Sequence, residues 1–193
     1  MTHPVYLVRH GQSEWNVLRL TQGQTAHPRL TDLGRDQAQR AARTIEKDLT
    51  GPSPRILSSD LVRARETAEV LARRLGVLDG QVVLDERLRE QHLGSLEGRG
   101  YDETWAVAAE HDWSDPTLPV AGGESLQDVH DRMASMLAGL DRNQVTVLVS
   151  HGDAIRAVLA HLGGLEPHQA PWVEVPNGAV ARIDGRAISW IDP

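Results

Sequence analysis

The stretch that decides the fold is Val145-Thr146-Val147-Leu148-Val149, which runs directly into Ser150-His151-Gly152. Five consecutive apolar or β-branched residues, without an alternating polar face, are typical of a strand buried on both sides. Such strands occur in parallel sheets that carry helices on both faces, so this stretch predicts an α/β fold. A second apolar run, residues 5–8, leads in the same way into Arg9-His10-Gly11.

The rest of the chain alternates helical periodicity with short apolar runs, and contains no repeat or low-complexity segment. This alternation predicts a single domain over residues 1–193, with a mainly parallel central sheet flanked by helices. Glycines that follow the last periodic residue, such as Gly76, are expected to end helices. The apolar spacing predicts helices over residues 31–49, 60–75, 126–140 and 153–162. Further strands are expected at residues 55–58, 81–84, 173–175, 179–183 and 187–191.

Two histidine–glycine pairs follow predicted strands, His10-Gly11 and His151-Gly152. In open α/β sheets the ligand crevice lies beyond the carboxyl ends of the strands. A single histidine at such a place is more often a hydrogen-bonding or capping residue than a functional one. Two copies, one of them preceded by Arg9, favour a functional site. A glycine after each histidine lets the backbone approach a bound group closely.

Composition excludes several classes of function. The 193 residues carry a formal net charge of -7, which argues against a general nucleic-acid binder. Cysteine is absent, so disulfides, thiolate metal sites and cysteine nucleophiles are excluded. The amino-terminal residues do not resemble a secretory signal, and no run of roughly 18 apolar residues occurs. We therefore expect a cytoplasmic protein without nucleic-acid or membrane partners, and leave a homodimer open.

Residues 7–16, Leu7-Val8-Arg9-His10-Gly11-Gln12-Ser13-Glu14-Trp15-Asn16, closely resemble the signature of the histidine phosphatase superfamily, also called phosphoglycerate-mutase-like. The order and spacing of the matching segments resemble the first branch of that family, in its small phosphatase type. The resemblance implies the phosphoglycerate-mutase-like three-layer sandwich with a short cap insertion near residues 97–123. It continues through residues 22–23, 30–34, 58–64, 88–90, 94, 122–125 and 149–152, and so covers most of the chain.

The resemblance implies a catalytic role for five residues. His10 matches the nucleophile that forms a phosphohistidine, and its imidazole must be neutral to attack phosphorus. Arg9 and Arg63 match the two arginines that bind the phosphoryl oxygens. His151 matches a second histidine that donates to the phosphoryl group in the transition state. Glu90 matches the acid and base of both half-reactions, so we expect its pKa to be raised.

The same resemblance implies a set of substrate contacts, and it implies no metal ion or other cofactor. The expected ligand is a small-molecule phosphate ester. Which nitrogen of His10 attacks is left open by the sequence. The positions implied to bind substrate are Arg9, Gly11, Asn16, Gln22, Gly23, Arg63, His151 and Gly152.

Other interpretations of these residues remain at this point. Arg63 lies in a helix rich in charges, where composition alone favours a solvated arginine. Glu86 competes with Glu90 for the acid and base role, because both lie in the charge run of residues 85–90. A metal site is a third interpretation, although the histidines show no metal-ligand spacing. A non-catalytic phosphate-binding regulatory module on the same fold is another.

Departures from the family pattern affect the substrate pocket. Leu20 stands where family members often carry an arginine, with Arg19 one residue earlier, and Gln91 stands where mutases typically have arginine. Residues 97–123 are short and contain one arginine or lysine, Arg99, against six acidic residues. Phosphoglycerate mutases carry a longer, basic segment here that seals the site, and retention of the phosphohistidine requires exclusion of water. The sequence therefore favours a phosphatase, with phosphoglycerate mutase as the alternative.

Overall fold

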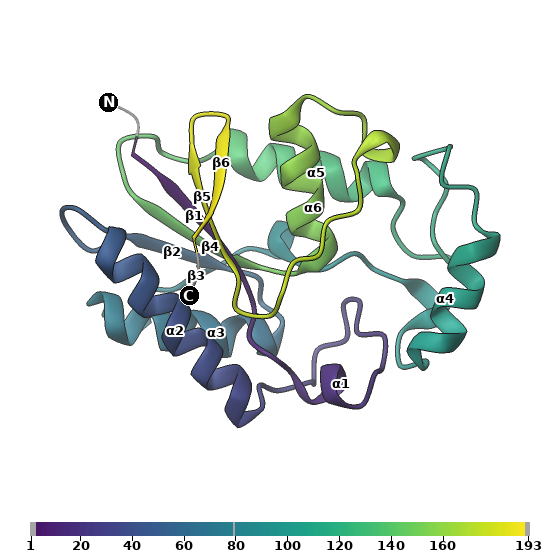
Figure 1. The fold of residues 1–193 in the computed structure, drawn as a ribbon, viewed down its shortest axis with the longest axis horizontal. Helices are drawn as coiled ribbons and strands as arrows, with labels where there is room; N and C mark the ends of the chain where they lie inside the picture. The colour runs from purple at the N-terminus through teal and green to yellow at the C-terminus, as the bar shows by residue number, and fades with distance from the viewer. Residues whose placement is uncertain (1–2, 79, 192–193) are drawn as a thin grey trace.

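The computed structural model describes residues 3–78 and 80–191, whose strands form a six-stranded mixed sheet (Figure 1). The strands lie in the order β3-β2-β4-β1-β5-β6. The first four in chain order run parallel, whereas β5 and β6 add to the edge in antiparallel orientation. The sheet is therefore mostly parallel, as the sequence predicts. The strand bounds are β1 Val5–Arg9, β2 Arg55–Ser58, β3 Val83–Leu84, β4 Thr146–Ser150, β5 Val180–Asp184 and β6 Ala187–Ile191.

Helices cover both faces of the sheet, with α2 and α3 on one side and α5 and α6 on the other (Figure 1). The predicted helices are confirmed with shifts of a few residues at their ends. The short α1, the helix α4 and three 3-10 turns were not predicted. In the described part of the chain, no helix combines the length and apolarity needed to cross a bilayer. The bounds are α1 Glu14–Val17, α2 Asp32–Asp48, α3 Val62–Leu75, α4 Tyr101–Glu110, α5 Leu126–Ala138, α6 Gly152–Gly163, η1 Glu86–Leu88, η2 Gly94–Leu96 and η3 Pro167–Gln169.

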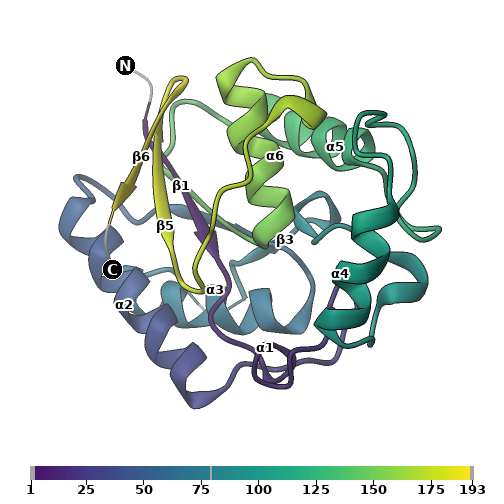
Figure 2. The ribbon, with the colours of Figure 1, turned by 45° about the vertical axis from the view of Figure 1, so that its right-hand side comes forward.

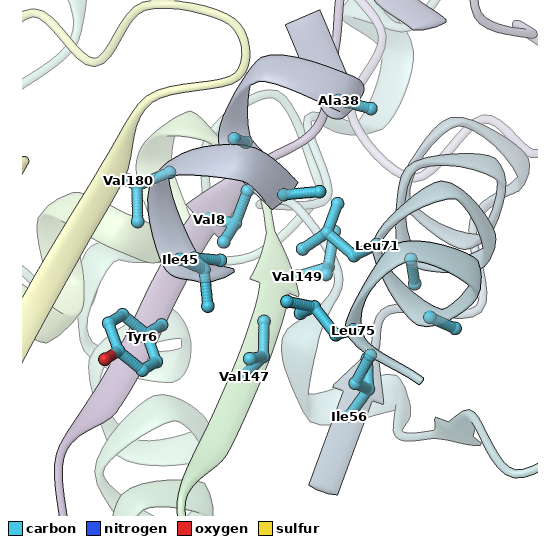
Figure 3. Packing of buried hydrophobic residues seen from close by; sticks show 14 of the residues in the cluster. Tyr6, Val8, Ala38, Ile45, Ile56, Leu71, Leu75, Val147, Val149 and Val180 are labelled. Atoms are coloured by element: carbon cyan, nitrogen blue, oxygen red, sulfur yellow. The ribbon is translucent and has the colours of Figure 1, made fainter. Parts of the chain in front are cut away.

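The core forms two layers because side chains alternate along each central strand. On β1, Tyr6 and Val8 pack under α2 and α3, whereas Leu7 packs under α5 and α6. Figure 3 shows the first of these layers, where Ile45 and Leu71 reach the sheet from the two helices. The chain contains no phenylalanine, so aliphatic side chains fill most of both layers, joined by Tyr6 in the first and by Met133 and Met136 in the second. Buried alanines on α2 and α3 allow the two helices to approach each other and the strands closely.

The prediction of a strand at residues 173–175 is wrong. These residues make no ladder, because β4 and β5 already pair with the two edges of β1. The segment instead crosses the carboxyl end of β1. The carbonyl of Val175 accepts a hydrogen bond from the Arg9 guanidinium, and Asn177 Nδ2 donates to the carbonyl of His10 over 3.1 Å. The apolar residues of this segment resembled those of a strand, but the segment instead anchors the carboxyl end of β1.

The predicted cap contains α4, which stands outside the three layers beside the turn that carries α1 (Figure 2). Backbone contacts join the two. Leu20 and Gly100 form an isolated antiparallel bridge, and the amide of Tyr101 donates to the carbonyl of Arg19 over 2.9 Å. The cap therefore borders the carboxyl ends of β1 and β4, where the sequence places the functional residues.

Two glycines bring the loop after β1 against the start of α2. A Cβ on Gly11 would lie 2.1 Å from the carbonyl oxygen of Gly34, and a Cβ on Gly34 would lie 2.1 Å from that of Gln12. Both obstacles are backbone atoms, which cannot rotate away as a side chain can. The contact fixes the peptide that follows His10.

We predict that Gly34→Ala lowers the free energy of unfolding by about 1–3 kcal/mol, measured by urea denaturation. Alanine normally favours a helix over glycine by about 1 kcal/mol, so the predicted sign is opposite to helix propensity. Gly139→Ala is the matched control, because Gly139 has right-handed helical dihedrals and its added Cβ would meet the nearest atoms at 3.6 Å. Equal urea midpoints for wild type and Gly34→Ala would contradict the packing argument.

Candidate active site

Parallel pairing of β1 with β4 places the two strand-end histidines side by side. Arg9 is in register with Ser150, and the amide of His10 donates to the carbonyl of Ser150 over 3.0 Å. The rings of His10 and His151 follow directly, with their centroids 5.0 Å apart and their planes tilted by 57°. Both side chains are buried. The site therefore begins at the edge of the sheet that the sequence predicts.

The backbone fixes the tautomer of His10. Its Nδ1 lies 2.7 Å from the carbonyl oxygen of Gly11, which can only accept a hydrogen bond. The proton of the neutral ring therefore sits on Nδ1, and Nε2 carries the lone pair. Burial lowers the pKa of His10 well below its ordinary value, and the positive charges of Arg63 and Arg9 lower it further. The imidazole is neutral at physiological pH, as a nucleophile must be.

Arg63 is buried, with 1% of its surface exposed, so its interpretation as a solvated helix arginine is wrong. Its two terminal nitrogens donate to the carbonyls of Gly23 and Thr25 over 2.7 and 3.0 Å. These bonds hold the loop of residues 22–25 against α3. Burial lowers the pKa of Arg63 to about 10, which still leaves the guanidinium charged at neutral pH.

Three buried nitrogen atoms lack a hydrogen-bond partner within residues 3–78 and 80–191: Arg9 Nε, Arg63 Nε and His151 Nδ1. Buried polar groups are normally paired, so each unpaired one needs an explanation. Both arginine Nε atoms are donors only. The other nitrogen of His151, Nε2, lies 2.9 Å from Ser59 Oγ. Two fixed positive charges with unpaired N–H groups, beside the His10 ring, form a site suited to a multivalent oxyanion.

Glu90 is held by the amino terminus of α6. Its Oε1 accepts from the amides of Gln91, Asp153 and Ala154 over 3.1, 3.0 and 3.2 Å. Because all three partners are donors, a proton on this carboxyl must sit on Oε2. Burial raises the pKa of Glu90 and the nearby Asp153 adds to it, while Arg9, Arg63 and the Gln91 amide oppose the rise. The raised pKa matches the expectation from sequence.

An ion pair also fixes the segment that carries Glu90. Arg132 of α5 donates to the carbonyls of Arg87, Arg89 and Glu90, and its guanidinium pairs with Glu124 over 2.8 Å. Glu124 belongs to a segment that resembles the family pattern, but no role for it follows from the sequence. Its position between Arg132 and this loop assigns it a structural function.

One cavity of about 770 Å³ contains most of the predicted residues. Its wall includes Arg9, His10, Asn16, Gln22, Gly23, Arg63 and Glu90. The competing carboxylate, Glu86, lies outside this wall; 76% of its side chain is exposed and it pairs with Arg89. The geometry therefore favours Glu90.

Three predicted contacts are not among the residues that line the cavity. His151 is one of them, and its ring lies beside that of His10, which does line it. The amide of Gly11 donates to Thr67 Oγ1 over 3.1 Å, so that donor is already used within the protein. A Cβ on Gly152 would lie 3.6 Å from Glu90 Oε2 and 3.8 Å from Arg9 Cζ, which places this glycine against both groups. For Gly11 and Gly152 the structure thus shows packing roles, and substrate contact stays a prediction.

Sequence reasoning missed the residues that position the site through backbone or hydroxyl groups. Ser59 contacts His151, Thr67 links Gly11 to the carbonyl of Arg63, and Val175 holds Arg9. Val175 acts through its carbonyl, which every residue carries, so no side-chain signal identifies it. Ser59 lies within a segment that resembles the family pattern, and its place directly after β2 was the available signal.

Comparison with known proteins identifies the family. The profile of the histidine phosphatase superfamily (branch 1) matches residues 5–190. The chain belongs to this family of phosphoryl-transfer enzymes.

Among curated relatives, a protein of Photorhabdus laumondii named probable phosphoglycerate mutase GpmB is 34% identical over 97% of this chain and 87% of its own length. Its namesake from Escherichia fergusonii is 36% identical with the same coverage. Among solved structures, a mycobacterial glucosyl-3-phosphoglycerate phosphatase in complex with VO3 has a TM-score of 0.79 and 34% identity, covering 98% of this chain and 96% of that one. The protein TTHB049 from Thermus thermophilus has a TM-score of 0.68 and 33% identity, covering 94% and 92%.

The raised pKa of Glu90 generates a prediction about pH. Its acid form persists to higher pH than that of an ordinary carboxyl. The acid role that the family resemblance implies for it predicts that donation to a departing alkoxide is lost as pH rises through the raised pKa. We expect Glu90→Gln to lower kcat/KM for an alkyl phosphate by about 10²–10⁴ and to remove that descending limb. Steady-state rates from acidic to alkaline pH provide the measurement. The matched control is Glu86→Gln, whose profile should follow wild type, and a descending limb unchanged in Glu90→Gln would assign the titration to another group.

Proposed function

We propose that this protein is a phosphatase that hydrolyses a small-molecule phosphate monoester through a phosphohistidine on His10. The observation that carries the proposal is the set of three unpaired, buried nitrogens around a neutral imidazole whose lone pair is on Nε2. The family assignment supports phosphoryl transfer. Hydrolysis as the outcome, and the role of each residue, are the proposal.

In the first step the ester phosphate binds with its non-bridging oxygens on Arg9 Nε, Arg63 Nε and His151 Nδ1. The Ser59 hydroxyl donates to His151 Nε2, which keeps the single proton of that neutral ring on Nδ1. His10 Nε2 attacks phosphorus while the bond to the ester oxygen breaks. Glu90 gives its Oε2 proton to the departing alkoxide and becomes a carboxylate. The fixed donors meet the charge on the equatorial oxygens in the transition state.

In the second step water hydrolyses the phosphohistidine. The Glu90 carboxylate accepts a proton from the water as its oxygen attacks phosphorus, and the bond between phosphorus and Nε2 breaks. Inorganic phosphate leaves, His10 returns to its neutral tautomer and Glu90 is protonated again. The hydrogen bond from Nδ1 to Gly11 stays in place throughout, so the ring keeps its orientation.

We predict that His10→Ala lowers phosphate release from p-nitrophenyl phosphate by at least about a thousandfold. Wild type quenched during turnover should carry one phosphoryl group on His10, detected by mass spectrometry under alkaline conditions. His3→Ala is the control, because His3 is an exposed histidine outside the cavity. Activity retained in His10→Ala would exclude the covalent mechanism. No turnover by wild type, with phosphate still bound, would support the non-catalytic module instead.

Phosphoglycerate mutase is the second candidate, because the curated relatives named above carry that name. Against it stands the cap, whose arginine does not reach the cavity. Arg99 is exposed and pairs with Glu103 over 3.1 Å. A mutase must also retain its product long enough to rephosphorylate it with water excluded. The name of the mycobacterial structural neighbour, a phosphatase, supports the hydrolytic alternative.

Turnover of 3-phosphoglycerate measures how the phosphoryl group is divided between water, which is hydrolysis, and return to the glycerate, which is mutase activity. We expect any turnover to release inorganic phosphate faster than it forms 2-phosphoglycerate, because we expect the short cap to admit water to the phosphohistidine. Phosphate is followed colorimetrically and the isomers by NMR in the same reaction. Interconversion of the two isomers faster than phosphate release would establish the mutase.

A further inference from the structure

The cavity continues well beyond the phosphate end, into an outer chamber between α4, α5, α6 and residues 167–172. Its wall there is apolar and aromatic. Three of the five tryptophans of the chain, Trp105, Trp113 and Trp172, line it, with Val129 of α5 and Ala157 of α6. A volume of about 770 Å³ is far more than a phosphate group needs and falls within the range of drug-sized ligands.

The tryptophans at this chamber are incompletely covered by the protein itself. Trp105 is 61% exposed and Trp172 is 67% exposed, although both line the cavity. Large exposed aromatic side chains around a concave site mark a surface that a ligand covers. Of the charged residues 85–90 that precede the cap, only Glu90 lines the cavity, and it lies at the phosphate end rather than in the outer chamber.

Among the residues that the structure describes, the outer chamber holds no arginine or lysine that lacks a carboxylate partner. Beyond the arginines at the phosphate end, the wall contains one more, Arg156. Its Nη1 pairs with Asp153 over 2.6 Å, its Nε donates to the carbonyl of Val173 over 2.7 Å, and its guanidinium stacks 4.7 Å from the Trp172 ring centroid. The wall also contains the imidazole of His168.

We propose that the alcohol part of the substrate is a bulky apolar group, aryl or medium-chain alkyl, that carries no second anionic group. The inference rests on the proposed function, because it assigns the occupant of the chamber next to the same phosphate site. Burial of apolar surface against the tryptophans stabilises such a ligand. A carboxylate in the chamber would lose its hydration without gaining an unpaired cation, and would lie near Asp153.

The size and charge of the group are tested with phosphonates, which cannot be hydrolysed, by titration calorimetry on the wild-type protein. We expect hexylphosphonate to bind at least about tenfold more tightly than methylphosphonate. We expect 5-carboxypentylphosphonate, which has the same chain ending in a carboxylate, to bind about tenfold more weakly than hexylphosphonate. Equal affinities of the hexyl and methyl compounds, or tighter binding of the carboxylate, would overturn the assignment.

Tryptophan variants locate the effect. Trp105→Ala and Trp172→Ala should each weaken hexylphosphonate binding by about tenfold and leave the affinity for methylphosphonate unchanged. Trp190→Ala is the matched control, because Trp190 is also a partly exposed tryptophan, at 42%, but lies on β6 outside the cavity wall. Unchanged hexylphosphonate affinity in both cavity variants would show that the chamber is not the binding site.

Turnover of hexyl phosphate, glycerol 3-phosphate and 3-phosphoglycerate separates this inference from the proposed function. The highest kcat/KM for hexyl phosphate supports both. Release of phosphate chiefly from 3-phosphoglycerate would retain the phosphatase and overturn the apolar substrate. Binding preference for hexylphosphonate without release of phosphate from any ester would support the apolar chamber and contradict the proposed hydrolysis.

Discussion

The parallel pairing of β1 with β4 is the constraint on which the rest of the site depends. The register that sets Arg9 opposite Ser150 makes the next residues, His10 and His151, neighbours. Side chains of the two strands alternate between two packed cores, so a shift of one residue would invert both faces at once. The geometry of the histidine pair is therefore enforced by the whole hydrophobic interior rather than by local contacts.

Burial then sets the electrostatic state of the paired residues. His10 and His151 lie among buried arginines, and both burial and positive charge keep the rings neutral. The same burial leaves donor nitrogens unpaired, which is costly in the protein alone. An oxyanion would satisfy these donors and compensate the arginine charges. The neutral imidazole of His10 and the positive charge around it are thus two consequences of one buried cluster.

The sequence predicted which side chains meet at the cavity where side-chain identity carries the information. His10, Arg63 and Glu90 were predicted by resemblance, and the structure places all three at one cavity. Prediction from the sequence failed at positions where a backbone group makes the contact. The segment around Val175 resembled a strand, yet its carbonyl is what holds Arg9, and hydrophobicity does not report the partner of a carbonyl. Glu124 lay in a quoted segment, but its pairing with Arg132 depends on how α5 packs.

The sequence by itself determined the α/β class, the positions of the six sheet strands and of the four longest helices, the absence of cysteine chemistry and the residue types available for phosphoryl transfer. These follow from local periodicity and composition, which no packing can alter. Only the tertiary structure decided that Nε2 of His10 carries the lone pair, that Glu90 rather than Glu86 faces the cavity, and that three tryptophans line its outer chamber. Those facts depend on contacts between residues far apart in the chain. The strand-end histidine pair is where both kinds of information meet: the sequence supplies the two rings, and the sheet register brings them within 5.0 Å.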